Sequence, residues 1–486
     1  MHRLLSAVAF ATGLLLAGSG SVQAAGLVTV SGPSPLSACV VPAVGGTIFP
    51  NAEVEPFVAA NPATPGNLIG AFQQDRWSNG GAHGLVAASS STGGASWSET
   101  PLPFNRCVAG GLPYERASDP WVSIGPDGIA YTVSISFNLS NNDNGVFAMT
   151  SGDGGQTWGK LRGLKVDNNQ NQFFNDKESV TADPVKKRTA YAVWDRLVGP
   201  TNNAAVEAHN FFAFTGPTWF SMTTDGGNTW STAQIIVNTG QNDQTIGNQI
   251  VVDPQTGAIY DFFDLIITTK SNATMVHGFN NAFVKSTDGG NTWSQPQIVD
   301  KLESVRVTDP NTGAALRTAD FDAAPAIDPA TGQLYLTWED ARFTGGKFDQ
   351  VVLTTSTNGG ASWSPLSVIN KVLTAPAFTP AISVNSVGAV AVTYYDFRNL
   401  ASDNTSTLPT DYWITFSTDG GASFGQEQHV AGSFNMLVAP SAGGFFVGDY
   451  EGLASAGTAF QPFFVATNCT DFSCTDNRTD VFSTTF

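Results

Sequence analysis

One eight-residue pattern occurs six times along the chain of 486 residues. Its copies are SSTGGASW (90–97), SGDGGQTW (151–158), TTDGGNTW (223–230), STDGGNTW (286–293), STNGGASW (356–363) and STDGGASF (417–424). Successive copies end at positions 97, 158, 230, 293, 363 and 424, so 61 to 72 residues separate them. Recurrence at such a period is the signature of a repeated structural unit. The repeat therefore predicts a fold assembled from similar units.

The residue types within each octet predict a hairpin that folds locally. An aspartate at the start of a turn can accept hydrogen bonds from backbone N–H groups just ahead of it, and paired glycines supply positive φ angles. The terminal aromatic residue can pack under the hairpin and hold it closed. These aspartates are therefore predicted to be structural rather than catalytic: Asp153, Asp225, Asp288 and Asp419.

The octets resemble Asp boxes, the BNR repeats of sialidase-type β-propellers. The resemblance covers most of the chain and implies an all-β propeller of four-stranded antiparallel blades. Asp boxes also occur in other glycosidases and in receptors that are not enzymes, so the resemblance is much more specific for the fold than for the function.

The spacing of predicted strands supports such blades. A β-rich segment precedes each of five octets, and a turn such as Asp253–Gly257 or Asp328–Gly332 stands before two of these segments. The segments are 68–73, 190–194, 258–263, 333–338 and 389–395. Strands predicted within 448–484, with an outer strand from 27–31, would add a seventh blade and close the ring. We favour seven blades; the alternative is six blades with a small appended sheet.

The N-terminus predicts export. A basic start is followed by an apolar run over 4–17 and by small residues around position 24, the pattern of a secretory signal peptide. We predict a signal peptide at 1–24, a single propeller domain at 25–486, and a secreted or periplasmic monomer. Four cysteines in an exported chain predict two disulfides, and the favoured pairing is Cys39–Cys107 with Cys469–Cys474.

Charge excludes several classes of partner. The formal net charge is −18, and only 13% of the residues are charged. A nucleic-acid-binding protein needs a basic surface, and anionic membranes attract basic ones. No later segment has the apolar length of a membrane span. We expect neither nucleic-acid binding nor membrane insertion.

The scarce charges gather in loops predicted to share one end of the central channel. This end lies opposite the octets, and ligands of propellers would meet there. Loops after the second strands carry Asp75, Arg76, Trp77, Asp195, Arg196, Arg342, Asp396 and Arg398. Loops entering the first strands carry Glu53, Glu55, Asp119, Asp176, Glu178, Asp320, Asp322, Asp449 and Glu451. Recurring Asp–Arg pairs can also be salt bridges between blades.

The resemblance to sialidases implies roles for some of these residues. Those enzymes use a tyrosine nucleophile, and guanidinium groups suit a carboxylate ligand. The implied catalytic residues are Asp119, Glu178 and Tyr395, and the implied substrate-binding arginines are Arg76, Arg196 and Arg342 or Arg398. From their own positions in the predicted loops, we add Trp77 as an aromatic platform for a sugar and Asp322, Asp449 and Glu451 as further substrate-binding residues. The Arg-Ile-Pro motif of the family is missing at Arg76.

The predicted function is a secreted, sialidase-like glycoside hydrolase that acts on an acidic or complex glycan. A glycosidase with a pair of carboxylates fits the same acids. The alternative class is a propeller that binds glycan or protein without catalysis. We expect no cofactor and no metal in the reaction; the acids would also suit a structural cation such as calcium.

Overall fold

The computed structural model describes residues 26–199, 215–271, 274–468 and 478–486. The predicted signal peptide and the proposed Cys469–Cys474 bridge lie outside these residues. Within the described ranges, no helix is long and apolar enough to cross a membrane.

The described strands form seven four-stranded antiparallel sheets, which we number in chain order. Sheet 1 is β3 (Val54–Ala60), β4 (Leu68–Trp77), β5 (Ala82–Ser90) and β6 (Ser98–Leu102), and sheet 2 is β7 (Arg116–Ile124), β8 (Ala130–Phe137), β9 (Asn144–Ser151) and β10 (Arg162–Asp167). Sheet 3 is β11 (Phe173–Ala182), β12 (Ala190–Val198), β13 (Thr218–Thr223) and β14 (Gln234–Val237), and sheet 4 is β15 (Gln244–Val252), β16 (Ile259–Ser271), β17 (Thr274–Ser286) and β18 (Gln297–Lys301). Sheet 5 is β20 (Ala324–Ile327), β21 (Leu334–Asp340), β22 (Gln350–Ser356) and β23 (Ser367–Val368), and sheet 6 is β24 (Ala377–Val384), β25 (Val390–Asp396), β26 (Pro409–Ser417) and β27 (Gln428–Asn435). Sheet 7 is β29 (Gly452–Ala456), β30 (Ala459–Thr467), β31 (Thr479–Ser483) and β1 (Val28–Thr29).

The remaining elements are short. Strand β2 (Ile48–Phe49) adds to β4, and β19 (Leu316–Arg317) pairs in parallel with β28 (Phe445–Phe446). Two 3-10 turns are η1 (Arg342–Thr344) and η2 (Met436–Val438). A single pairing of Ala82 with Ala117 joins sheets 1 and 2 into one larger sheet.

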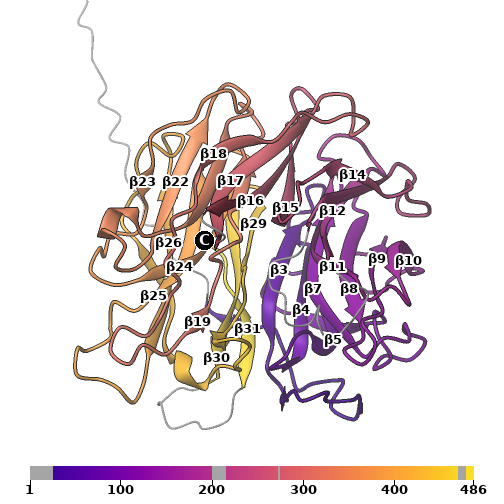
Figure 1. Ribbon diagram of the computed structural model, residues 1–486, viewed down its shortest axis with the longest axis horizontal. Helices are drawn as coiled ribbons and strands as arrows, with labels where there is room; N and C mark the ends of the chain where they lie inside the picture. The colour runs from indigo at the N-terminus through magenta and orange to yellow at the C-terminus, as the bar shows by residue number, and fades with distance from the viewer. Residues whose placement is uncertain (1–25, 200–214, 272–273, 469–477) are drawn as a thin grey trace, which may run out of the picture.

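The first strands of the seven sheets form a closed ring. Strand β3 contacts β7, and contacts continue through β11, β15, β20, β24 and β29 back to β3. Figure 1 shows this closure, with the yellow strands β29 and β31 beside the indigo strand β3. Val28 pairs with Ser483, so the N-terminal strand supplies the outer strand of sheet 7, as expected. The prediction of an all-β propeller with four-stranded antiparallel blades is confirmed.

The octets join the third and fourth strands of sheets 1 to 6. In sheet 4, Asp288 accepts hydrogen bonds from the backbone N–H and the hydroxyl of Thr292, at 2.9 and 2.6 Å, and from the hydroxyl of Ser286 at 2.9 Å. These bonds lower the pKa of Asp288 to about 2. The structural role predicted for the octet aspartates therefore has a direct local cause.

The octet tryptophans reach farther than the predicted contact under their own hairpin. The Trp293 indole donates to the carbonyl of Gly290 in its own octet at 3.2 Å, which closes the hairpin. Its ring packs edge-on against Phe220 of sheet 3, with 5.3 Å between the centroids. The octet therefore also joins neighbouring sheets, and the core lies between the sheets as a series of clusters.

Two adjacent glycines in this octet provide a matched stability test. Both have positive φ, 77° at Gly289 and 89° at Gly290. A Cβ at Gly289 would meet nothing within 4 Å, whereas one at Gly290 would lie 2.8 Å from Cζ of Phe220. We expect Gly289→Ala to cost about 1 kcal/mol of backbone strain and Gly290→Ala to cost about 1–3 kcal/mol more. Urea unfolding of the two variants would measure this, and equal losses would contradict the packing described.

Candidate active site

A repeated bulge turns side chains of the first strands toward one end of the ring. The register shifts at equivalent places in β3, β7, β11, β15 and β24. Each shift contains a residue with positive φ: Glu55 (53°), Asp119 (53°), Lys177 (48°), Gly247 (71°) and Thr379 (48°). Only the fourth is a glycine, so the other four hold an unfavourable backbone conformation. Bulges and positive φ of this kind concentrate at functional sites, which makes this end the candidate site.

Lys177 connects three carboxylates that lie in, or just before, the first strands of three other sheets. Its ammonium nitrogen lies 2.6 Å from Asp449, 3.0 Å from Asp322 and 3.7 Å from Glu55. Only 10% of its side chain is exposed. The three acids raise the pKa of Lys177 well above its usual value against the effect of burial. Lys177 is therefore a charged centre that holds together segments far apart in the sequence.

Arg317 binds the same aspartate from the side of β19. Its Nε donates to Asp449 Oδ1 at 2.9 Å and its Nη2 donates to Oδ2. Although burial acts in the opposite direction, Arg317 and Lys177 lower the pKa of Asp449. Asp449 is thus a carboxylate at neutral pH, with both oxygens engaged.

A cavity of about 390 Å³ opens at this cluster. It is lined by Asp176, Lys177, Ile246, Arg306, Leu316, Arg317, Thr318, Asp320, Phe321, Asp322, Ala442, Gly443 and Asp449. An adjoining space of about 10 Å³ shares Lys177 and Asp322 with it and is also lined by Asp119 and Glu178. The first volume suits a sugar ring, and the second is about the size that holds one water molecule.

Two carboxyl groups here have properties useful for acid–base chemistry. Burial and the charge of Asp119 raise the pKa of Asp176 to about 7, although Lys177 and Arg317 oppose the shift. Asp119 Oδ1 accepts a hydrogen bond from Ser118 Oγ at 2.9 Å. Among the described residues its Oδ2 has no hydrogen-bond partner, so this oxygen can bind a ligand or water. The site therefore offers a protonated carboxyl near neutral pH and a second carboxyl with an unused oxygen.

Glu178 lies beside Asp119 but is enclosed. Among the described residues, neither of its carboxyl oxygens has a hydrogen-bond partner, and both are buried. Burial and the neighbouring Asp119 raise its pKa well above the usual range. Glu178 is therefore held as a neutral acid. It lines the 10 Å³ space together with Trp121 and Tyr450.

Tyr395 and Glu451 lie together in the core between sheets 6 and 7. The Tyr395 hydroxyl donates to the carbonyl of Val465 at 2.7 Å, and its ring packs 4.5 Å from that of Tyr412. Glu451 accepts the backbone N–H of Val465 at 3.1 Å. Neither residue lines the 390 Å³ cavity or the 10 Å³ space that Asp119 lines, so the structure does not bring Tyr395 together with Asp119 at either place.

Three arginines expected to bind substrate are paired with acids of the propeller. Arg196 forms a bidentate pair with Asp167 of sheet 2, at 2.8 and 2.7 Å. Arg342 binds Asp340 at 2.8 Å and Asp300 of sheet 4 at 3.1 Å, and Arg398 binds Asp396 and Glu427 at 2.6 Å each. Arg196 and Arg342 thus form salt bridges between neighbouring sheets, whereas both acids that bind Arg398 belong to sheet 6.

Replacing Arg196 tests its structural role. Its guanidinium also lies 3.7 Å from the centroid of Phe173, and Asp167 is buried. We expect Arg196→Gln to lower the free energy of unfolding by about 2 kcal/mol, because Asp167 loses two charge-assisted hydrogen bonds. Ligand binding at the channel would be unchanged. Chemical denaturation measures the first effect, and normal stability with lost binding would assign Arg196 to the substrate instead.

Arg76 and Trp77 are both buried at the edge of the cluster. The Arg76 guanidinium donates to Gln73 at 2.6 Å and lies 5.0 Å from the centroid of Phe446. Burial lowers its pKa, and Glu55 opposes the shift. The Trp77 ring lies 4.3 Å from the guanidinium carbon of Arg116, so Trp77 is enclosed by protein rather than presented as an open platform.

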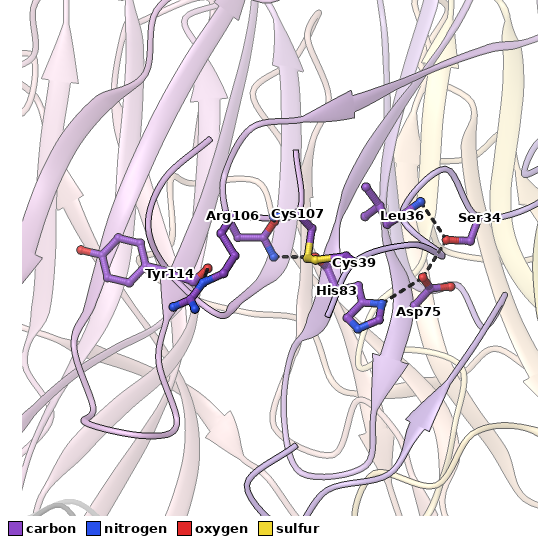
Figure 2. The surroundings of a disulfide bond; sticks show 9 residues. Ser34, Leu36, Cys39, Asp75, His83, Arg106, Cys107 and Tyr114 are labelled. Atoms are coloured by element: carbon purple, nitrogen blue, oxygen red, sulfur yellow. Dashed lines mark hydrogen bonds and ion pairs between the residues drawn. A yellow bond between two sulfur atoms is a disulfide. The ribbon is translucent and has the colours of Figure 1, made fainter. Parts of the chain in front are cut away.

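The end of strand β4 is fixed by the N-terminal segment. Figure 2 shows Asp75 between Ser34 and His83, with Asp75 Oδ2 2.6 Å from Ser34 Oγ and 3.2 Å from His83 Nδ1. The disulfide Cys39–Cys107 is present beside them and closes a sequence separation of 68 residues. One of the two predicted disulfides is therefore confirmed. His83 is buried and hydrogen-bonded to Asp75.

Lys177 and Arg317 are the site residues that sequence reasoning missed. The sequence does contain a pattern that could have located Lys177. Glu55-Pro56-Phe57 and Asp119-Pro120-Trp121 place an acid, a proline and an aromatic residue at the same point of two first strands. Lys177-Glu178-Ser179 occupies that point in sheet 3. Within the described part of the chain, no group of three or more His, Cys, Asp or Glu side chains has a geometry for a metal ion.

Residues 218–442 match a family model described as a BNR repeat-like domain, and this segment contains four of the six octets. The resemblance to Asp-box, or BNR-repeat, proteins is confirmed. A search of curated proteins found no sequence that matches this chain.

Three solved structures illustrate the likeness to known folds. An α-L-arabinanase of Penicillium chrysogenum, complexed with arabinobiose, is 11% identical over 95% of this chain and 98% of its own, with a TM-score of 0.46. The Hadza microbial sialidase is 13% identical over 86% and 76% of the two chains, with a TM-score of 0.46. A protein of unknown function from Dyadobacter fermentans is 12% identical over 90% and 97%, with a TM-score of 0.45.

Proposed function

We propose that this BNR-repeat chain is a secreted glycoside hydrolase that cleaves a glycan at the 390 Å³ cavity. The observation that carries the proposal is the pair of unlike carboxyls at one end of the ring. Asp176 has a pKa raised to about 7, and Asp119 has an unused oxygen beside a space for one water molecule. Glycoside hydrolysis requires a proton donor and a second carboxylate in these two roles.

In the proposed reaction, Asp176 is the general acid. Its carboxyl proton passes to the oxygen of the leaving group while the bond between that oxygen and the anomeric carbon breaks. Asp119 is the general base: it takes a proton from the water molecule whose oxygen forms the new bond to the anomeric carbon. Asp176 ends as a carboxylate and Asp119 as a carboxylic acid, and proton exchange with solvent restores both.

The surrounding charges favour carboxylate chemistry over a tyrosine nucleophile. Tyr395 is hydrogen-bonded in the core, and Arg196, Arg342 and Arg398 each bind protein carboxylates. Lys177 and Arg317 hold Asp449 and Asp322 in place around the cavity. Carboxylates anchored in this way can accept hydrogen bonds from sugar hydroxyls and orient the ring.

The test is mass spectrometry of products released from a panel of neutral, uronic-acid-containing and sialylated glycans. The wild-type protein is expected to release a sugar from at least one glycan, and Asp176→Asn and Asp119→Asn are each expected to slow this release by at least about 100-fold. Asp403→Asn, a change at an exposed aspartate, is the matched control and should behave as wild type. Retention of a glycan without release by any of these proteins would favour the non-catalytic binding class and contradict the proposal.

A further inference from the structure

A second cavity, of about 500 Å³, lies on the loops of sheets 5 and 6. Its lining comes from the segment before β20, the loop after β21, the segment before β24 and the loop after β25. These segments correspond to the loops that carry the candidate active site in the other sheets. The second cavity therefore opens at the same end of the propeller as the 390 Å³ cavity.

The charged side chains of the second cavity are mostly cationic, in a protein whose net charge is −18. Arg306, Lys347 and Arg398 line it, and Asp309 is its single acid among the described residues. Asp309 is committed to its own turn, where it accepts the backbone N–H of Asn311 at 2.9 Å and the hydroxyl of Thr312 at 2.6 Å. Among the described residues the lining itself therefore holds three cations and one acid, and Asp320, Asp396 and Glu427 pair with two of these cations from outside it.

Lys347 and Arg398 differ in the number of ion pairs that they form with acidic residues of the protein. Lys347 is exposed and forms no ion pair with any described residue. Arg398 binds two acids, but its Nη2 has no hydrogen-bond partner in the described structure. That nitrogen is buried, so the group that an anionic ligand in this cavity can reach is the unpaired Lys347 ammonium.

Arg306 connects this cavity to the candidate active site. It lines both cavities, and 63% of its side chain is exposed beside Asp320, which it contacts at 3.1 Å. Its φ is 65°, and the loop is fixed by Asp349, which accepts the backbone N–H of Val305 at 3.1 Å and the hydroxyl of Ser304 at 2.9 Å. The structure thus holds this arginine in a strained conformation between the two cavities, as is common where position matters for binding.

The walls of the second cavity suit a saccharide. Phe348, Phe397, Pro310 and Pro376 add apolar surface beside the cations. Aromatic and proline faces can pack against the C–H face of a sugar ring, while arginine and lysine bind a carboxylate or sulfate group on its edge. A neutral sugar would leave the Lys347 ammonium without an anionic partner.

We infer that the second cavity is a subsite for an acidic sugar of the same glycan, one that carries a carboxylate or a sulfate ester, next to the sugar whose bond is cleaved. This inference rests on the proposed function, because it names the class of glycan that the hydrolase recognises. It places the selection of the acidic sugar on Arg306 and Lys347, away from the carboxyls that carry out hydrolysis.

Isothermal titration calorimetry with Asp176→Asn tests the subsite without turnover. The probes are an oligogalacturonate, a sulfated galactan oligosaccharide and a neutral galactan oligosaccharide of equal length. At least one acidic probe is expected to bind about tenfold more tightly than the neutral one, the size of one charge-assisted contact, and this preference should weaken as salt increases. The tighter acidic probe identifies the anion as carboxylate or sulfate.

Variants locate the preference. Adding Lys347→Gln is expected to remove most of the preference for the acidic probe while leaving the affinity for the neutral probe unchanged. Lys160→Gln, which removes the same charge from an exposed lysine, should retain the preference. Equal affinities for acidic and neutral probes, or a preference that survives Lys347→Gln together with Arg306→Gln, would overturn the subsite. A failure of hydrolysis would appear separately, as absence of products from the wild-type protein.

Discussion

Asp176→Asn is expected to slow glycan cleavage by about 10²- to 10⁴-fold, the range found when a general acid is removed. An asparagine at this position keeps the shape of the side chain but cannot give a proton to the leaving group. Because the substrate contacts remain, the dissociation constant for the glycan should change much less than the turnover number. Initial-rate kinetics on the glycan found by product analysis would measure both quantities.

The role of Asp176 as general acid also predicts the direction in which activity changes with pH. Asp176 must be protonated to act, and its pKa is raised to about 7. Activity in the wild type should therefore be present below that value and decline as pH rises through it. Asp176→Asn should lack this alkaline limb, whereas the Asp403→Asn control should retain it. An unchanged alkaline limb in Asp176→Asn would show that another group supplies the proton.

Lys177→Met is expected to destabilise the fold by about 3–5 kcal/mol, the usual cost of removing one partner from a buried charge network. The change leaves Asp449, Asp322 and Glu55 close together without the cation that all three approach. Methionine keeps a similar side-chain volume, so a cavity contributes little to the loss. Urea unfolding followed by tryptophan fluorescence would measure the difference.

Two comparisons separate the charge effect from general disturbance. Lys160→Met removes an exposed lysine and should change stability by less than about 0.5 kcal/mol. Combining Lys177→Met with Asp322→Asn should recover part of the loss, because Lys177 is the cation that Asp322 contacts and one uncompensated carboxylate is removed. A double variant that is less stable than Lys177→Met alone would contradict the role assigned to the lysine.

The repeat architecture could be predicted from the sequence because its determinants are local. Each octet contains its own aspartate, glycines and aromatic residue, and the hydrogen bonds of Asp288 lie within the octet itself. The closing strand at Val28–Thr29 was also accessible, since an unpaired edge needs a partner. The acids near the first strands could also be predicted to lie at one end of the ring, because they occupy equivalent places in successive repeats.

The arrangement inside the site depends on contacts that the sequence does not display. Lys177 points into the cluster because of the bulge in β11, and its partners are 122 to 272 residues away. The same reason explains the arginines: Arg196 could be assigned to substrate or to structure, and Asp167 on a neighbouring sheet is the contact that distinguishes the two. The burial of Tyr395 likewise depends on packing between sheets 6 and 7.

The most direct test of the central claim is a crystal structure of Asp176→Asn with an oligosaccharide that the wild-type protein cleaves. We expect the saccharide in the 390 Å³ cavity, with its glycosidic oxygen within hydrogen-bond distance of the side chain at position 176 and a water molecule on Asp119. A saccharide bound at the octet face, or one whose glycosidic oxygen lies away from both residues, would contradict the claim that these carboxyls carry out the cleavage.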